Sequence, residues 1–141
     1  MTGGQFSPLS GFGTIATTAP YQNIDYDFDI VDLAVAAGAS FVARTTTYHV
    51  KQMADIFMQA ILHEGFSVVE VMSQCPTYFG RKNRLGGAVD MMEYFKDHTT
   101  PVGSEAKKKD SNLIERGIFI QEERPEYCSE YERIIERAMT G

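Results

Sequence analysis

The sequence predicts an α/β fold with a mainly parallel sheet and flanking helices. Apolar residues recur with helical spacing over residues 48–64, and short runs rich in β-branched and apolar residues lie on either side, at 40–44 and 66–72. This strand, helix, strand order predicts two parallel strands joined by a right-handed crossover. With 141 residues and 43% hydrophobic content, the chain is most economically one domain, residues 1–141.

Residues 1–27 carry glycine and proline among many serines and threonines, without a sustained period. We therefore expect an irregular segment. Loops of this length in compact domains are usually functional or a sign that the assignment of helices and strands is incomplete, and both apply here. Gly11 to Ala16 matches the G-x-G-x-x-A pattern of dinucleotide sites, but no strand precedes it. A glycine-rich turn is the better interpretation.

The first helix and the first βαβ unit come next. Asp29 is expected to cap a buried helix over residues 30–37, which Gly38 ends. The helix over 48–64 should pack through one face, and the strand over 66–72 should be largely buried. The residues expected on that helix face are Val50, Met53, Ala54, Phe57 and Ile61.

The second half of the chain predicts fewer regular elements. A helix over residues 87–97 should direct Val89, Met92 and Phe95 inward, and residues 99–112 lose all pattern and are expected to form a surface loop. A third strand is expected over 117–121, followed by a helix with Pro125 in its first position. The expected packing stripe of this last helix is Tyr127, Tyr131, Ile134, Ile135 and Ala138.

Charge and composition exclude some classes of partner. The net charge of -6 and the pI near 5.0 argue against nucleic-acid and anionic-membrane binding, so proteins and small molecules are the expected partners. No apolar run is long enough to span a bilayer, and the residues after Met1 do not form a signal sequence, which predicts a cytoplasmic location. In that compartment Cys75 and Cys128 are not expected to form a structural disulfide.

The loop after the 66–72 strand holds the candidate site, because ligands of α/β sheets bind at the carboxyl ends of strands. Cys75 is a possible nucleophile or soft metal ligand, with Arg81 and Lys82 nearby to favour its thiolate, or else a bystander. A Cys75–His49 dyad is a weaker alternative. Arg81 and Lys82 suit phosphate or carboxylate recognition, or form a solvated basic loop.

Five blocks of sequence, in this order, resemble a known family. The blocks are Met1-Thr2-Gly3-Gly4-Gln5 with Ser7-Pro8, Phe41–Arg44, Gly65-Phe66-Ser67 with Val69-Glu70-Val71, Ser73–Thr77, and Glu123–Tyr127. They are similar to the carboxyl-terminal half of the β subunit of a 2-oxoacid:ferredoxin oxidoreductase, closest to the 2-oxoglutarate (2-oxoglutarate synthase) branch. The resemblance covers nearly the whole chain and implies part of a thiamine-diphosphate-binding fold.

The resemblance also implies cofactor residues. Met1, Thr2, Gly3, Gly4 and Gln5 would line thiamine diphosphate, whose Mg²⁺ ligands lie in family motifs that this sequence lacks. Glycines there would let backbone N–H groups approach the diphosphate. Cys75 matches one ligand of the family's [4Fe-4S] cluster. Arg81 and Lys82 are expected to contact substrate or partner, and no catalytic residue is identified.

The activity implied by the resemblance is oxidative decarboxylation of a 2-oxoacid, 2-oxoglutarate in this branch, to its acyl-CoA with reduction of ferredoxin. Its partners would be the α subunit, with or without smaller subunits, together with ferredoxin, the 2-oxoacid and coenzyme A. We expect the 141-residue chain alone to be inactive and to bind none of the three cofactors. The alternative is a non-catalytic α/β module that binds partners and lacks the cofactor site.

Overall fold

The computed structural model describes residues 3–140 and is built around a four-stranded sheet. The strands lie in the order β2-β1-β4-β3. Pairing of β1 with β2 and of β3 with β4 is parallel, whereas the central pair, β1 with β4, is antiparallel. The α/β class with a mainly parallel sheet is confirmed. The strands are β1 (Phe41–Thr46), β2 (Ser67–Met72), β3 (Thr99–Pro101) and β4 (Ile114–Gln121).

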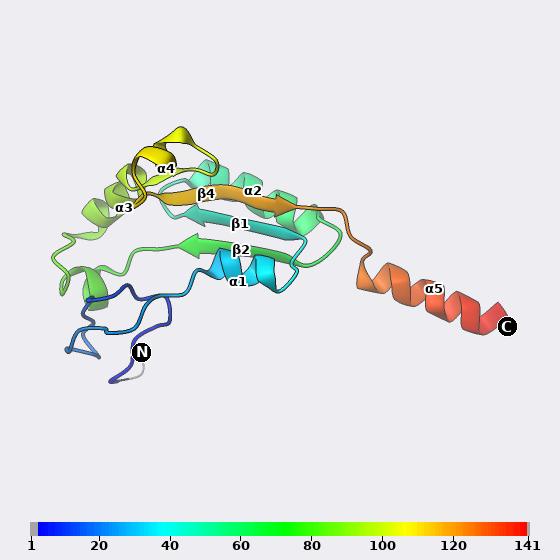
Figure 1. Cartoon of the computed structure of the whole chain (residues 1–141), viewed down its shortest axis with the longest axis horizontal. Coiled ribbons are helices and arrows are strands. Elements are labelled where there is room, and N and C mark those ends of the chain that lie inside the picture. Colours follow the sequence, from blue (N-terminus) through cyan, green and yellow to red (C-terminus); the bar gives the residue numbers. More distant parts are fainter. Residues whose placement is uncertain (1–2, 141) are drawn as a thin grey trace.

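Helices flank this sheet and connect its strands (Figure 1). Helix α1 precedes β1, and α2 makes the crossover between β1 and the parallel strand β2, which is the predicted βαβ unit. A short η1 turn and α3 follow β2, α4 joins β3 to β4, and α5 ends the described chain. Their bounds are α1 (Ile30–Ala36), α2 (Val50–Leu62), η1 (Pro76–Gly80), α3 (Ala88–Asp97), α4 (Glu105–Lys109) and α5 (Tyr127–Thr140).

Strand β1 is the centre of the core, because α1 and α2 pack on its two opposite faces. Val42 packs with Val31 and Ala34 of α1, whereas Phe41 and Ala43 pack with Ile56 of α2. Successive side chains of a strand point to opposite faces, so both helices can be held by one short run of residues. Every residue of β1 is buried as a result.

A buried cation links α1 to the sheet. The Arg44 guanidinium lies 2.6 Å from the Asp29 carboxylate and 2.5 Å from the Glu70 carboxylate. Glu70 is the register partner of Arg44 on β2, and Asp29 also accepts hydrogen bonds from the first turn of α1 as its predicted N-cap. The Arg44 side chain is only 10% exposed, so both anions compensate a charge that would otherwise be costly to bury.

Several predicted burial patterns were wrong. Val50, Phe57 and Ile61 are exposed, and the buried residue of α2 is Ile56. Because α2 is apolar around most of its surface, helical spacing alone did not select the face that meets the sheet. Half of Leu33 on α1 is also exposed, and β2 is half-buried because it lies at a sheet edge.

Two further corrections concern α3 and the segment after it. Helix α3 buries Met91 and Phe95, whereas Val89 is exposed. The expected surface loop at 99–112 contains strand β3 and the short helix α4. Strand β3 forms because it pairs with the more distant β4, and a three-residue strand carries no periodic signal of its own.

Helix α5 differs most from its prediction. It begins at Tyr127 rather than at Pro125, buries no residue and projects away from the sheet and its helices (Figure 1). Arg124 attaches the preceding segment by donating to the Gly38 carbonyl at 2.8 Å. The expected packing stripe is therefore exposed, with Met139 continuing it. Among the described helices, none is long and apolar enough to cross a membrane.

Candidate functional site

The loop that follows β2 is wound into an uncommon backbone turn. The N–H of Gly80 donates to the carbonyl of Cys75 at 2.9 Å, and that of Arg81 donates to Pro76 at 3.0 Å. These bonds span five residues, a π-type spacing that is rare and frequent at functional sites. A Cβ atom on Gly80 would lie 2.4 Å from the Met91 sulfur, so glycine allows the turn to pack directly on α3. The chain after Cys75 is thus held against the body of the fold.

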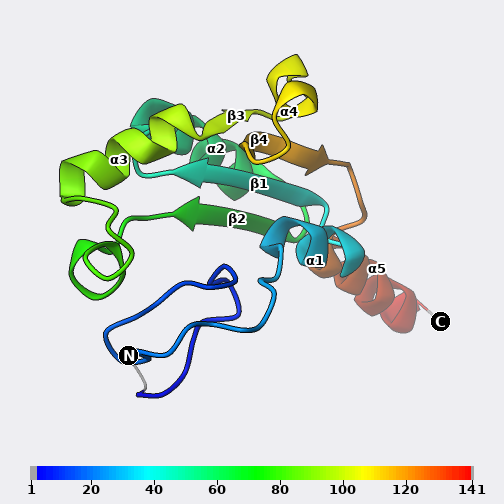
Figure 2. The same cartoon turned by 60° about the vertical axis from the view of Figure 1, so that its left-hand side comes forward.

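Asn83 connects this turn to the amino-terminal segment. Its Nδ2 donates to the Ile15 carbonyl at 2.7 Å and to the Phe79 carbonyl at 2.9 Å, and its Oδ1 accepts from the Ile15 N–H at 2.9 Å. The Thr17 N–H donates to the Tyr78 carbonyl at 2.9 Å. Figure 2 shows this segment lying below β2 and beside the turn. Asn83 was predicted only as a member of the candidate loop, and its contact with Ile15 was missed because the two residues lie 68 positions apart along the chain.

An open pocket of about 410 Å³ lies where the two segments meet. Arg81 and Lys82, both predicted as contacts for substrate or partner, lie together in its lining. The remaining lining residues are Thr17 from the amino-terminal segment and Thr77 and Tyr78 from the turn. Such a lining combines positive charge with hydroxyl groups, which suits an anionic ligand.

The amino-terminal segment is irregular over residues 3–27, and hydrogen bonds hold it at several points, among them the N–H groups of Gly4, Gly13 and Asn23. The buried Asn23 organises it: Nδ2 donates to the carbonyls of Ser10 at 2.6 Å and Asp25 at 3.1 Å. The Gly13 N–H donates to the Asn23 carbonyl at 2.7 Å, so the G-x-G motif lies in a loop and not between a strand and a helix. The segment also encloses a second open pocket of about 660 Å³.

Gly4 and Gln5, two of the predicted cofactor residues, line this second pocket. Open space surrounds the Cα atoms of Gly3 and Gly4, where a Cβ would meet nothing within 4 Å. Gly4 has a φ of 76°, a conformation that glycine adopts easily, and its N–H donates to Thr18. Exposed backbone of this kind fits the approach of a diphosphate group. Met1 and Thr2 lie outside the described residues.

The predicted metal ligand, Cys75, is exposed at the start of the η1 turn, and Cys128 is exposed on α5. Over residues 3–140 no group of three or more histidine, cysteine or acidic side chains is arranged to hold a metal ion. An iron–sulfur cluster of the [4Fe-4S] type takes four cysteine ligands, and Mg²⁺ on a diphosphate takes near-octahedral oxygen ligands. These residues therefore fit one cluster ligand and part of a diphosphate cradle, but complete neither site.

The three histidines have structural partners. His49 bonds to Thr46 Oγ1 at 2.8 Å, and no hydrogen bond within the described chain joins it to Cys75. Burial, together with the nearby charge of Arg116, lowers the pKa of His49. His63 bonds to Ser40 Oγ at 2.8 Å, and His98 stacks on the Tyr94 ring at 3.9 Å. The geometry gives a Cys75–His49 dyad no support.

Comparison with known proteins places this geometry in context. Residues 1–71 match the family model described as thiamine pyrophosphate enzyme, C-terminal TPP binding domain. The chain is 44% identical over 140 residues to the 2-oxoglutarate synthase subunit KorB of Methanothermobacter marburgensis, covering 96% of this chain and 49% of that protein. It is 39% identical to the KorB subunit of Methanocaldococcus jannaschii, covering 97% and 52%. The chain thus spans about half the length of the curated relatives it matches.

A solved structure supports the fold. The chain aligns with a TM-score of 0.77 and 23% identity to a chain of the 2-oxoglutarate:ferredoxin oxidoreductase from Magnetococcus marinus, solved with 2-oxoglutarate, coenzyme A and succinyl-CoA bound. The alignment covers 96% of this chain and 48% of the other. At this level of identity the likeness concerns the fold alone. The resemblance drawn from the five sequence blocks is confirmed by the KorB relatives.

Proposed function

Since the chain belongs to the family of the C-terminal TPP binding domain of thiamine pyrophosphate enzymes, we propose that it is part of the β subunit of a 2-oxoglutarate:ferredoxin oxidoreductase. The assembled enzyme would convert 2-oxoglutarate and coenzyme A to succinyl-CoA and carbon dioxide, and the two electrons released would reduce ferredoxin. The observation that carries this proposal is the 44% identity to a 2-oxoglutarate synthase subunit over 140 residues.

One feature of the fold supports this assignment. The segment proposed to hold thiamine diphosphate and the loop proposed to hold the cluster are joined through Asn83 and Ile15. A redox enzyme of this kind gains from such a link, since electrons leave the cofactor for the cluster and a fixed separation keeps their transfer reproducible. The connection is made by backbone and amide groups alone, without a charged residue.

The residues proposed for thiamine diphosphate are Met1, Thr2, Gly3, Gly4 and Gln5. When bound, the cofactor supplies the carbanion and electron sink that 2-oxoacid decarboxylation requires. In our proposal the exposed backbone at Gly3 and Gly4 faces the diphosphate, and Mg²⁺ takes its oxygen ligands from outside the described residues. Arg81 and Lys82 contact an anionic substrate.

We assign Cys75 as one thiolate ligand of a [4Fe-4S] cluster. Its exposure at the turn after β2 leaves its sulfur accessible to a cluster whose remaining thiolates come from elsewhere in the assembly. Cys128 is the natural comparison, because it is equally a free, exposed cysteine but lies on the projecting helix α5. Partners of the assembly would be the α subunit and ferredoxin.

The test is co-expression of the chain with the other subunits, followed by assay of ferredoxin reduction that depends on both 2-oxoglutarate and coenzyme A. Cys75→Ala should lose bound iron, the reduced-cluster paramagnetic signal and ferredoxin reduction, while thiamine diphosphate binding is largely kept. Cys128→Ala should keep all four properties. A fully loaded, active Cys75→Ala enzyme would refute the ligand assignment, and the absence of 2-oxoglutarate-dependent activity in the wild-type assembly would refute the function.

A second candidate function, a non-catalytic module that binds partners, is favoured by α5. This helix of 14 residues has an apolar stripe and no buried residue. Isolated helices of this length are only marginally stable in water, so a partner that covers the stripe would stabilise it. The two functions separate in the same assay: this module would assemble with partner subunits without conferring thiamine diphosphate binding or turnover.

A further inference from the structure

The pocket beside the η1 turn has a lining that suits a phosphate group more closely than a single carboxylate. Its five lining residues, Thr17, Thr77, Tyr78, Arg81 and Lys82, include two cations and three hydroxyls and no acidic side chain. A phosphate monoester carries close to two negative charges at neutral pH and three strong acceptor oxygens. The Thr17 hydroxyl already donates to the Tyr78 carbonyl, so the donors left for a ligand are the two cations and the hydroxyls of Thr77 and Tyr78. These groups match that charge and that number of acceptors.

The two cations are available to a ligand. Across residues 3–140 the ion pairs involve other basic residues, and no side-chain hydrogen bond engages Arg81 or Lys82. An arginine fork can bind two phosphate oxygens at once, and a lysine adds a point charge. The chain as a whole has a net charge of -6, so this local positive charge is opposite in sign to the net charge of the chain.

The backbone beneath these side chains is fixed on three sides. Thr17 is bonded to Tyr78, Asn83 is bonded to Ile15, and Gly80 packs against Met91. A site that is already held in its binding geometry loses little conformational entropy when the ligand arrives. The exposed ring of Tyr78 adds a flat apolar wall at the side of the pocket.

We propose that this pocket binds the phosphate groups of coenzyme A. This proposal rests on the proposed function, in which coenzyme A and thiamine diphosphate are the two phosphate-bearing molecules. Two of the residues proposed for thiamine diphosphate, Gly4 and Gln5, line the 660 Å³ pocket. That pocket shares no lining residue with the pocket beside the η1 turn. Coenzyme A is then the phosphate-bearing substrate without an assigned site.

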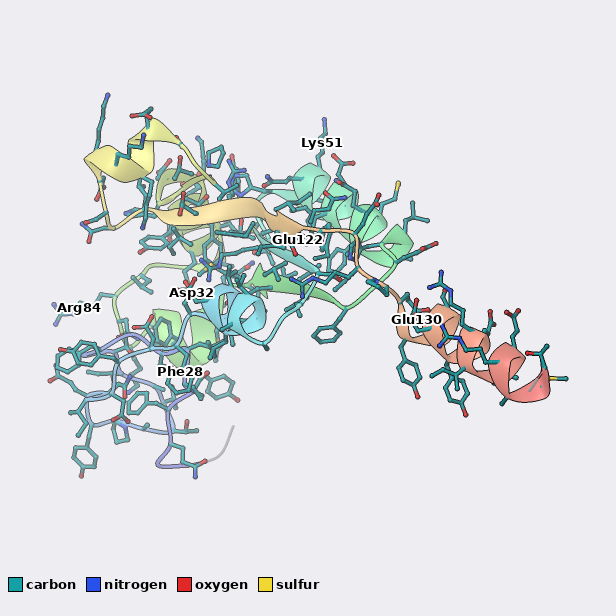
Figure 3. The ribbon with its side chains drawn as sticks, turned by 45° about the vertical axis from the view of Figure 1, so that its right-hand side comes forward. Phe28, Asp32, Lys51, Arg84, Glu122 and Glu130 are labelled. Atoms are coloured by element: carbon teal, nitrogen blue, oxygen red, sulfur yellow. The ribbon has the colours of Figure 1, made fainter. Side chains whose placement is uncertain are left out.

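The experiment is calorimetric titration of coenzyme A into the full 141-residue chain and its variants. Arg81→Ala and Lys82→Ala should each weaken binding by about tenfold or more, the usual effect of losing a charged hydrogen bond. Arg81→Lys should recover part of the affinity. Arg84→Ala is the matched control, because Arg84 is on the same loop but outside the pocket, and its side chain points away from the body (Figure 3).

Three companion ligands identify the bound group. Pantetheine lacks every phosphate of coenzyme A and should bind the wild-type chain at least about tenfold more weakly, with no further loss in Arg81→Ala. Inorganic phosphate should compete with coenzyme A. Thiamine diphosphate should compete no better than inorganic phosphate, whereas tighter competition that depends on Arg81 would overturn coenzyme A as the occupant.

Other outcomes would also overturn the proposal. One is that coenzyme A does not bind to the wild-type chain. A second is that Arg84→Ala and Lys82→Ala lose the same affinity for coenzyme A. A third is that Arg81→Ala and Lys82→Ala, in the assembled enzyme, change the KM for ferredoxin alone. The last result would assign the basic loop to docking of an acidic protein. Because the titration does not require turnover, an inactive assembly would refute the proposed function while leaving the phosphate site measurable.

Discussion

The side chain of Asn83 pairs with both backbone polar groups of Ile15, accepting from its N–H at 2.9 Å and donating to its carbonyl at 2.7 Å. A side-chain amide here takes the place of a neighbouring strand. These two hydrogen bonds hold the irregular amino-terminal segment against the turn after β2.

Asn83→Ala should lower the free energy of unfolding by about 1–3 kcal/mol, because it leaves the part-buried N–H and carbonyl of Ile15 without partners. Urea denaturation measures the loss, and hydrogen exchange at the Ile15 amide should accelerate. Asn112→Ala is the control, since Asn112 is exposed on a turn and only its backbone N–H is hydrogen-bonded. An unchanged exchange rate at Ile15 in the Asn83 variant would contradict the proposed effect of the Asn83–Ile15 hydrogen bonds.

The contact of Asp29 with Arg44 should make stability depend on pH. Burial acts to raise the pKa of Asp29, but the hydrogen bond and charge of Arg44 and the N–H groups of Val31 and Asp32 outweigh it and lower the pKa from 3.8. A depressed pKa in the folded state means that Asp29 stabilises the fold fully above about pH 4 and loses this effect as the pH falls below it.

Asp29→Asn keeps the shape of the residue and its ability to cap a helix, so it isolates the charge. The difference in unfolding free energy between wild type and Asp29→Asn should be largest at neutral pH and shrink below about pH 4. Denaturant titrations at a series of pH values measure this difference. The same difference at pH 3 and pH 7 would show that the carboxylate charge is not what stabilises the contact.

His49 should produce a second pH dependence at higher pH. Burial lowers its pKa from 6.5, and the positive charge of Arg116 lowers it further. The unfolded chain then binds a proton more readily than the folded chain, so stability should fall as the pH drops below about 6.5 and level off below the folded pKa.

His49→Gln should remove this slope, and Arg116→Gln should raise the pKa of His49 toward its usual value. The His49 pKa can be followed by NMR titration of its ring protons, and stability by denaturation between pH 5 and pH 8. If the His49 signal in Arg116→Gln titrated at the same pH as in wild type, the charge of Arg116 would not be acting on it.

Removing α5 should change the free energy of unfolding little. A chain that ends at Pro125 loses a helix without buried residues, so its free energy of unfolding should stay within about 0.5 kcal/mol of wild type. The control is Val31→Ala, which shortens a side chain that is only 3% exposed and should cost about 1–3 kcal/mol. Denaturation of both variants provides the comparison, and a large loss on removing α5 would mean that its stripe packs within the chain.

The sequence predicted local features correctly where residues close together along the chain decide the structure. Asp29 caps α1 through its own carboxylate, Gly38 follows that helix with a φ of 84°, and the 48–64 pattern contains α2. The parallel pairing of β1 and β2 followed from the strand, helix, strand order, because the intervening helix returns the chain to the end of the sheet at which the first strand began.

The roles given to the site residues stay predictions, and the structure shows only which of them lie together. Arg81 and Lys82 were expected to act together, and they share a pocket with Thr17, which no local pattern could have indicated. The stripe of α5 was read correctly as amphipathic, but amphipathic spacing reports only that a helix has an apolar face. Whether that face is covered depends on other segments, and within the described chain none covers it.

The sequence by itself determined features that are set by neighbours along the chain: helices α1, α2, α3 and α5, the two parallel strands β1 and β2, the cap at Asp29 and the family blocks from Met1 to Tyr127. Only the tertiary structure decided which residues of α2 are buried, that β3 forms, that Arg44 bridges two acids, and that Asn83 joins the segment of Ile15 to the Cys75 turn. Each of these depends on contacts between residues far apart in sequence, and spacing along the chain carries no information about which distant partner will be met.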